Sequence, residues 1–362
     1  ARAESGDRGT LARLHLCRAN LAPTHGDQRA VTAGIEEALA LARRHGDPLL
    51  VGDALTVRGG NHSLAGRHAE GLIDVLDAQD LFEAAEDTVR ATRNLQAVGI
   101  AYRRMGELPK AREYLERSLE HGIATGDWDQ EFVGLLQLGF LHEENGDPAS
   151  AKAMFLRGVE RAAALGRSAD EGFAGLGLAS AEASLNRPRA ALTALREARR
   201  AFAEGKVPGD EPMLSLIEGD ALAQLGRLDE ALDRLDASVA AWTPPGNERY
   251  LALALDKRSK VREAAGDIAG ALADLRRQHV LRLADDRQRA EQRADLRRYE
   301  FDVARRDAEN QELRTTEALR KKQVEALEAA RRWQWTAMAL GAVLLPGLVA
   351  GVLRQLAKAR RL

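Results

Sequence analysis

Cysteine and aromatic residues are scarce in this 362-residue chain. Its single cysteine, Cys17, excludes an intramolecular disulfide framework. Aromatic residues make up only 4% of the chain, whereas Ala, Leu, Arg and Glu are abundant, and this balance favours helices over strands. Because the chain is too long for one compact core, we expect it to contain more than one structural part.

A large net charge and a leading apolar segment are also absent. The 53 Lys and Arg residues are balanced by 55 Asp and Glu, and the formal net charge is -2. Without an overall basic field, nucleic acid is not an expected partner. The first ten residues contain no apolar run and form no signal peptide; a signal removed before Ala1 and a fragmentary chain both agree with this.

Motifs for catalysis, metal binding and phosphate binding are missing as well. The sequence has no HExxH, CxxC or paired-histidine spacing, no Walker loop and no GxSxG. His15 and Cys17 are two residues apart on an expected helix and point to different faces, which disfavours a metal site. We therefore expect no catalytic residues, no metal, no cofactor and no enzyme activity in these residues.

The sequence does contain a repeat with a 40-residue period. Within YRRMGELPKAREYLERSL, Gly106 separates two helical patterns, and each step of 40 residues from it reaches glycine or asparagine. Both residue types tolerate the left-handed backbone that ends a helix, so these positions predict a recurring turn. The predicted turn residues are Gly26, Gly66, Gly106, Gly146, Asn186, Gly226 and Gly266.

The residues around each turn repeat too. Small residues stand seven positions before it, at Ala19, Gly59, Gly99, Gly139, Ala179, Gly219 and Ser259. Apolar residues stand nine positions after it, at Ile35, Val75, Leu115, Phe155, Leu195, Leu235 and Leu275. Small residues let two antiparallel helices approach closely, and the apolar residue fills the space between them. A second turn 20 residues later retains Gly46, Gly126, Gly166 and Gly246, so each unit is two helices.

A small residue, a turn glycine and a large apolar residue at these offsets resemble the tetratricopeptide repeat. The usual unit has about 34 residues, and the longer unit here resembles a subgroup found in bacterial signalling proteins. The resemblance covers about residues 10–285. The family's proline near the end of the second helix is missing, and its first-helix aromatic is clear only at Tyr102. The resemblance to the tetratricopeptide repeat implies an all-α, α-α superhelical solenoid of about seven repeats.

In that family the first helices of the repeats line a concave groove that binds a protein or peptide. The resemblance therefore implies groove positions in the central repeats at Arg93, Gln96, Ile100, Arg103, Arg104, Val133, Leu136, Phe140, Glu143, Glu144 and Phe173. The alternative is that these residues are ordinary packing or solvated positions. The identity of the ligand does not follow from the sequence.

After the repeats, residues 271–334 contain neither proline nor glycine, so nothing in the sequence ends the last helix there. A coiled-coil assignment places Leu296, Val303, Asn310, Glu317 and Val324 at one core position. The other core position holds Tyr299, Arg306, Leu313, Arg320 and Leu327. Asn310 is the kind of polar core residue that fixes the register of a parallel dimer. We expect a homodimer through this helix, with a single charged helix as the alternative.

The composition then changes abruptly. The segment from Trp335 to Leu353 is uncharged and almost wholly apolar, and its length is enough to span about 30 Å of hydrocarbon. Trp333 and Trp335 stand at its start, as aromatic residues do at a membrane interface. A kink at Pro346 is tolerable in a membrane span. We expect this segment to contact membrane lipid.

Charges beside the span predict its orientation. Basic residues follow it without any acid, at Arg354, Lys358, Arg360 and Arg361. Before it, Arg331 and Arg332 are offset by Glu325 and Glu328. The positive-inside rule then places the C-terminus in the cytoplasm and the repeats outside it, at a bacterial inner membrane.

The expected organisation has five parts. They are an N-terminal tail (1–9), the solenoid (10–285), a signalling helix or coiled coil (286–332), a transmembrane helix (333–353) and a basic cytoplasmic tail (354–362). In such an arrangement a ligand that alters the curvature of the solenoid could act through the unbroken helix on the cytoplasmic side.

Two short segments carry a second resemblance. RRYEFDVARRDAENQELR (297–314) is similar to the stretch before the span in bacterial membrane-bound diguanylate cyclases with extracytoplasmic tetratricopeptide repeats. RQLAKARRL resembles the start of the helix that leads into their GGDEF domain. This implies a sensory module whose output domain is not among these residues. A membrane-tethered scaffold without output and the sensory half of a histidine kinase are the alternatives.

Overall fold

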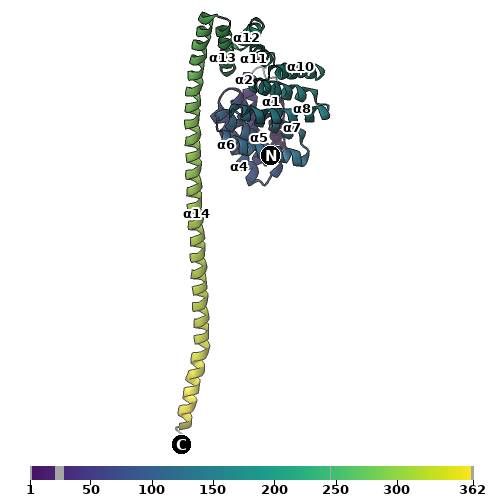
Figure 1. Ribbon diagram of the computed structural model, residues 1–362. Coiled ribbons are helices and arrows are strands. Elements are labelled where there is room, and N and C mark those ends of the chain that lie inside the picture. Colours follow the sequence, from purple (N-terminus) through teal and green to yellow (C-terminus); the bar gives the residue numbers. More distant parts are fainter. Residues whose placement is uncertain (1, 21–27, 245, 360–362) are drawn as a thin grey trace. The chain divides into compact units, whose positions relative to one another are not determined.

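The computed structural model describes residues 2–20, 28–244 and 246–359, and the regular elements in these ranges are all helices (Figure 1). Fourteen helices are described there, in seven consecutive pairs. They are α1 (Arg2–Asn20), α2 (Gln28–His45), α3 (Pro48–Leu64), α4 (His68–Ala84), α5 (Thr88–Met105), α6 (Leu108–Thr125), α7 (Trp128–Glu144), α8 (Pro148–Ala164), α9 (Ser168–Ser184), α10 (Pro188–Glu204), α11 (Glu211–Gln224), α12 (Leu228–Trp242), α13 (Glu248–Ala264) and α14 (Ile268–Ala359). The all-α solenoid predicted from the repeat is confirmed.

The chain divides into two compact units, residues 1–296 and residues 297–362. The first, which we call the solenoid, contains α1 to α13 and the beginning of α14. The second, which we call the distal helix, contains the rest of α14. The predicted repeat range, 10–285, lies within the first unit.

Left-handed turns recur every 20 residues from residue 46 to residue 266. Positive φ is found at the predicted positions Gly66, Gly106, Gly146, Asn186, Gly226 and Gly266, whereas Gly26 lies outside the described residues. Two further turns occur at Glu86 (φ 55°) and Lys206 (φ 54°), which are not glycine. The 20-residue period of left-handed turns therefore continues at positions that are not glycine. The packing around Glu86 and Lys206 holds them in the left-handed conformation, which residues with a side chain disfavour.

Hydrogen bonds close these turns in the same manner. The Arg67 amide donates to the His62 carbonyl at 2.9 Å, and the Asp147 amide donates to the His142 carbonyl at 2.9 Å, which is the Schellman pattern. The aspartate after the turn then caps the next helix: the Asp147 carboxylate accepts from the Ser150 amide at 3.1 Å. Because helices end and begin at the same positions in each repeat, α3 to α10 have 17 or 18 residues each.

The core of a repeat is the contact between its two helices. A methyl group added to the small residue before the turn would collide with the apolar residue after it. The four such pairs are Gly59 with Val75 (2.8 Å), Gly99 with Leu115 (2.7 Å), Gly139 with Phe155 (2.5 Å) and Gly219 with Leu235 (2.7 Å). The apolar side chain therefore occupies the space that a first-helix side chain would need.

Phe155 shows how one such contact joins two repeats. Its side chain is fully buried, and its ring also lies where a Cβ on Gly177 of the next repeat would be, 2.5 Å away. The ring of Phe140 packs edge-on against it with centroids 5.3 Å apart. Residues of α7, α8 and α9 thus share one aromatic core.

The distal helix continues α14 without a break, and Pro346 lies inside it. One helix in the described part of the chain, Ile268–Arg354, is long and apolar enough to cross a membrane. Its most apolar 18-residue window has a mean hydropathy of 2.1, and 0% of that window is buried. Leu296, the first residue of the predicted coiled-coil core, is only 5% exposed. Because Leu296 is buried within this chain, it is not available to a second helix.

Replacing Gly139 with valine should destabilise the solenoid by roughly 1–3 kcal/mol, because the Phe155 ring cannot move away while Gly177 packs against its other side. Thermal unfolding of the full chain in detergent measures the loss. Gly60→Ala on α3 is the matched control: a Cβ there has nothing within 4 Å and should gain up to about 1 kcal/mol from helix propensity. Equal losses in both variants would contradict the packing described.

Candidate functional site

The predicted groove residues lie on the first helices of three adjacent repeats, α5, α7 and α9. Gln96, Ile100 and Arg103 are spaced by three or four residues and share one face of α5, where each is partly buried. Val133, Leu136, Phe140, Glu143 and Glu144 follow similar spacing on α7. Arg93, on the same helix as Arg104, is 66% exposed at its side chain, and Phe173 on α9 is 42% exposed.

Arg103 connects α5 to α7. Its Nε donates to Gln137 Oε1 at 3.1 Å, and its guanidinium lies 5.6 Å from the centroid of the Phe140 ring. Its Nη1 donates to Glu144 Oε1 at 2.6 Å. Three residues predicted for the groove, Arg103, Phe140 and Glu144, are therefore in direct contact.

Glu144 also contacts a helix that is distant in sequence. Arg249 of α13 donates from Nη2 to the same Glu144 Oε1 at 2.8 Å, although the two residues are 105 positions apart. Stacked repeats have therefore curved until α13 meets α7. The face that carries Arg103, Glu144 and Arg249 is accordingly an inner surface of the solenoid, and no local sequence pattern indicated that Arg249 would lie on it.

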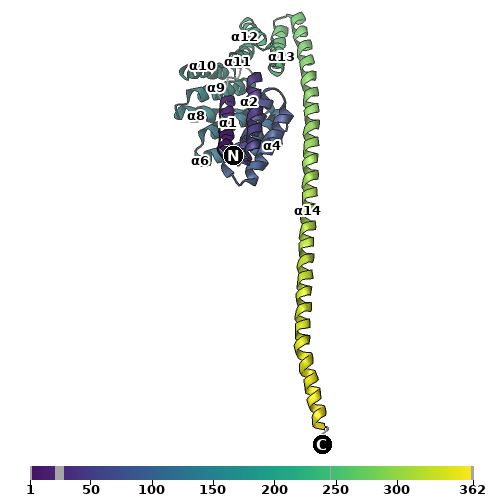
Figure 2. The same ribbon diagram turned by 180° about the vertical axis from the view of Figure 1, so that it is seen from behind.

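The beginning of α14 contacts the early repeats. Gln288 and Gln292 both donate from Nε2 to the Gly66 carbonyl, at 3.1 and 2.7 Å. Arg293 Nε lies 3.8 Å from Glu107 Oε1. Gly66 and Glu107 belong to the α3–α4 and α5–α6 turns, so α14 links the last repeat to two early ones. We call these five residues the α14 clasp; Figure 2 shows α13 leading into α14.

His68, at the start of α4, lies in a strongly positive environment beside the clasp. Burial and, after it, the nearby charges of Arg104, Arg289 and Arg249 together lower its pKa to about 4, with Asp285 acting in the opposite direction. His68 is therefore neutral near pH 7. Its Nδ1 atom is buried and has no hydrogen-bond partner among the described residues.

Arg104 lies in the same environment. Burial lowers the pKa of its guanidinium, and the neighbouring Arg103 guanidinium contributes in the same direction. The charges of Arg103, Arg249, Glu144 and Tyr250 act on the Arg104 guanidinium. Among the described residues, Arg104 forms no hydrogen bond and no ion pair. We call Arg103, Arg104, Arg249 and Arg289, with His68 and Tyr250, the arginine cluster.

Glu143 lies beside Glu144 on α7. Burial, with a smaller contribution from the Glu144 charge, raises its pKa to about 7, against the effect of a hydrogen bond with the Ser180 side chain. Its Oε1 is buried and finds no hydrogen-bond partner in the part of the chain that the structure describes. Near neutral pH this carboxyl group is therefore partly protonated.

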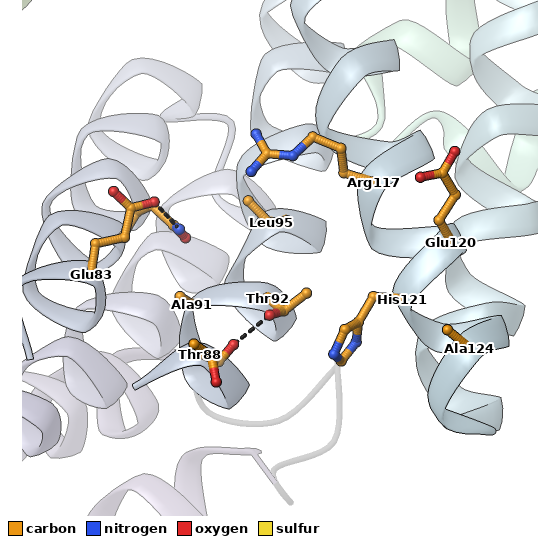
Figure 3. A pocket seen from close by; sticks show the side chains of 10 residues that line it. Glu83, Thr88, Ala91, Thr92, Leu95, Arg117, Glu120, His121 and Ala124 are labelled. Atoms are coloured by element: carbon orange, nitrogen blue, oxygen red, sulfur yellow. Dashed lines mark hydrogen bonds between the residues drawn. The ribbon is translucent and has the colours of Figure 1, made fainter. Parts of the chain in front are cut away.

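A separate cavity of 490 Å³ lies between α4, α5 and α6 (Figure 3). Its polar residues bond with one another or with adjacent helices: Gln79 donates to Glu83 at 2.7 Å, and His121 Nδ1 lies 3.1 Å from Gln130 Oε1. The residues that line it are not among those predicted for the groove. In the described ranges no three His, Cys, Asp or Glu side chains are grouped to hold a metal ion.

Glu143 should make the solenoid less stable as the pH rises. Because the folded chain holds its proton more tightly than the unfolded chain does, folding free energy is lost as the pH rises from about 4.5, the ordinary pKa of a glutamate, to about 7. Between about pH 5 and pH 8, wild type should lose up to about 3 kcal/mol relative to Glu143→Gln. Thermal unfolding of both chains at the two pH values measures this, and parallel pH profiles would contradict a buried, proton-holding Glu143.

Three solved structures illustrate the likeness of this fold to known proteins. A Rap protein complexed with competence and sporulation factor is 14% identical, covers 73% of this chain and 72% of its own, and has a TM-score of 0.58. The Rap conjugation gene regulator of plasmid pLS20, in complex with the Phr* peptide, is 15% identical, covers 77% and 74%, and has a TM-score of 0.58. NprR in complex with its cognate peptide NprX is 14% identical, covers 75% and 77%, and has a TM-score of 0.56.

No protein-family model and no curated protein sequence matches the chain. At identities this low, the likeness to the solved structures concerns the fold alone. The chain folds as a tetratricopeptide-like helical-repeat solenoid.

Proposed function

We propose that the chain is the ligand-binding sensory part of a single-pass membrane signalling protein. The observation that carries this proposal is the continuity of α14, which begins in the last repeat, forms the clasp with two early repeats and continues through the apolar segment. One continuous helix is thereby shared by the solenoid and the expected span.

The proposed ligand is a peptide or a segment of another protein, bound on the inner surface. Support comes from the side chains there, which combine aromatic rings with guanidinium and carboxylate groups, at Arg103, Phe140, Glu144 and Tyr250. The Rap regulator of pLS20 and NprR are described with bound peptides. Their low identity to this chain makes that an analogy of fold.

The proposed membrane span is 333–353, with the repeats outside the cytoplasm of a bacterial inner membrane. It is supported by the exposed side chains of Trp333, Trp335, Leu344 and Leu348, each more than half exposed. Exposed apolar side chains in this number are typical of a lipid-facing helix. The uniformly basic segment after the span supports a cytoplasmic C-terminus.

The proposed mechanism is mechanical. A ligand held between α5, α7 and α13 changes how closely these helices approach, and the clasp transfers the change to α14. In a homodimer, the helix from Tyr299 to Leu327 would then rotate or shift register and reposition the cytoplasmic ends. Leu313, Val324 and Leu327 are largely exposed and could form the seam of such a dimer.

The output proposed first is a diguanylate cyclase domain, on the resemblance of residues 297–314 and of the basic tail. A GG(D/E)EF motif encoded after Leu362 would support it. A phosphoacceptor histidine followed by an ATP-binding domain would instead support a histidine kinase, and a stop codon a membrane-tethered scaffold.

Reporter fusions test the topology. Alkaline phosphatase joined after Leu362 should be inactive in bacterial cells, because the basic tail keeps it in the cytoplasm, while a green fluorescent protein joined there should fluoresce. For these fusions the chain needs an export signal before Ala1. Phosphatase joined at Arg331 of the same exported chain, before the span, should be active. Active phosphatase after Leu362 would contradict the proposed orientation.

Site-specific photo-crosslinking tests ligand binding. Peptides selected on the full chain from a displayed random library should crosslink to p-benzoylphenylalanine at Ile100, on the inner face of α5. The matched control is the same photo-probe at Leu156, which is 38% exposed on the second helix α8. Crosslinking that favours Leu156, or equal yields at the two positions, would exclude the inner surface as the binding site.

A further inference from the structure

We propose that an exposed stripe at the start of α14 packs against the same stripe of a second copy of this chain, so that a dimer interface begins in the last repeat. The stripe, which we call the end stripe, consists of Ile268, Leu272, Leu275 and His279. The proposal rests on the proposed function for one point, that the span gives neighbouring copies the same direction in a membrane. It adds a contact between solenoids to the helical seam proposed further along α14.

Leu275 occupies the repeat position whose apolar side chain fills the space between two helices. In the six earlier repeats the side chain at this position is at most 2% exposed, whereas Leu275 is 43% exposed. The six equivalent residues are Ile35, Val75, Leu115, Phe155, Leu195 and Leu235. The last repeat therefore keeps a core residue at this position but lacks the neighbour that would bury it.

Inside the solenoid, that neighbour is the first helix of the next repeat. The ring of Phe155, on α8, lies where a Cβ on Gly177 of α9 would be. Leu192 of α10, two repeats before Leu272 in the same position, packs against the buried core of α11 to α13. In the last repeat Leu272 is 46% exposed and Ile268 62% exposed, so no helix among the described residues covers this face of α14.

The spacing of the end stripe suits a second helix. Its members are four, three and four residues apart, the alternation with which core residues follow one another in a coiled coil. The face of α14 that meets α13 is a different one. On that face Asp274 accepts hydrogen bonds from Arg258, and Ala271 and Gln278 are buried. The helix can therefore hold its own repeat on one face and a partner helix on the other.

Charges that continue the end stripe complement themselves. Arg282 and Asp286 follow His279 by three and seven residues, on the same face of α14. Both are exposed, and neither forms a hydrogen bond or an ion pair with another described residue. In a parallel pair of helices related by a two-fold axis, Arg282 of each copy lies beside Asp286 of the other, so two ion pairs form by symmetry. Such exposed pairs select the partner and its register more than they hold it.

A second copy is the occupant that these features favour. An isologous contact needs a surface that complements itself, and here apolar side chains meet apolar ones and opposite charges meet. The ring of His279 meets its own counterpart, and a neutral imidazole can both donate and accept a hydrogen bond. Because the proposed span lies on the same helix, two copies in one membrane present α14 in the same direction.

The contact gives the beginning of α14 two sets of neighbours. The clasp joins it to early repeats of its own chain, and the end stripe joins it to the partner. A change of curvature in either solenoid then acts on both α14 helices, so the two copies respond together.

Cysteine crosslinking of the full chain in detergent tests the contact. Cys17→Ser first removes the single native cysteine. In that background Ile268→Cys and Leu275→Cys, one heptad apart, should each give a disulfide-linked dimer on mild oxidation, because both side chains face the two-fold axis. Val280→Cys is the matched control, since Val280 is 65% exposed on another face of the same helix. It should crosslink about fivefold less or weaker still.

A charge in the end stripe supplies a second variant. Leu272→Glu should lower the yield of the Leu275→Cys dimer by about tenfold, because two carboxylates would be buried against each other. Val280→Glu should leave that yield unchanged. Both positions are exposed in the single chain, so the melting temperatures of the two variants should equal that of the parent chain.

Equal dimer yields at residues 275 and 280, or no dimer at either, would overturn the proposal. So would a Leu275→Cys chain that crosslinks to a retained Cys17 and not to residue 275 of the second copy, a result that places α1 of the next copy on the end stripe. Leu313→Cys, on the distal helix, separates this failure from that of the proposed function. If it crosslinks while Leu275→Cys does not, the proposed dimeric sensor stands without the end stripe, and if neither crosslinks, the proposed homodimer fails as well.

Discussion

The close approach of two helices, at a position where the first has almost no side chain, is the contact on which the solenoid depends. Gly139 and Phe155 show it most clearly, since a single methyl group on the glycine would occupy the place of the aromatic ring. Because the same small and large residues return every 40 positions, each repeat stacks on the next with a similar geometry. Small rotations between neighbours then add up along the chain until α13 meets α7.

That accumulated curvature creates the inner surface. Glu144 accepts hydrogen bonds from Arg103, in the preceding repeat, and from Arg249, three repeats later. The return of the chain also brings α14 to the α3–α4 and α5–α6 turns, where Gln288 and Gln292 share the Gly66 carbonyl. Side-chain contacts within residues 1–296 consequently join the proposed binding surface to the beginning of the helix proposed to carry its signal.

Local features of this arrangement could be predicted from the sequence, and distant ones could not. Gly106 and its equivalents predicted the repeat because glycine and asparagine are typical of a left-handed backbone. Glu86 and Lys206 adopt the same left-handed conformation although their residue types do not indicate it. The contact of Arg103 with Phe140 and Glu144 joins neighbouring repeats, whose facing positions follow from the period. Arg249, His68 and the α14 clasp depend on the summed rotation of several repeats, which no local pattern encodes. Leu296 has the apolar character of a coiled-coil core residue, yet the fold buries it within its own chain.

The central claim is that occupation of the inner surface acts on α14 through the clasp. Hydrogen–deuterium exchange of the full chain in nanodiscs, with and without a saturating displayed peptide, tests it most directly. The account predicts that exchange changes together in residues 60–68, at the α3–α4 turn, and in residues 285–296 of α14, in addition to the helices that contact the peptide. Altered exchange confined to α5 and α7, with residues 285–296 unaffected, would contradict it.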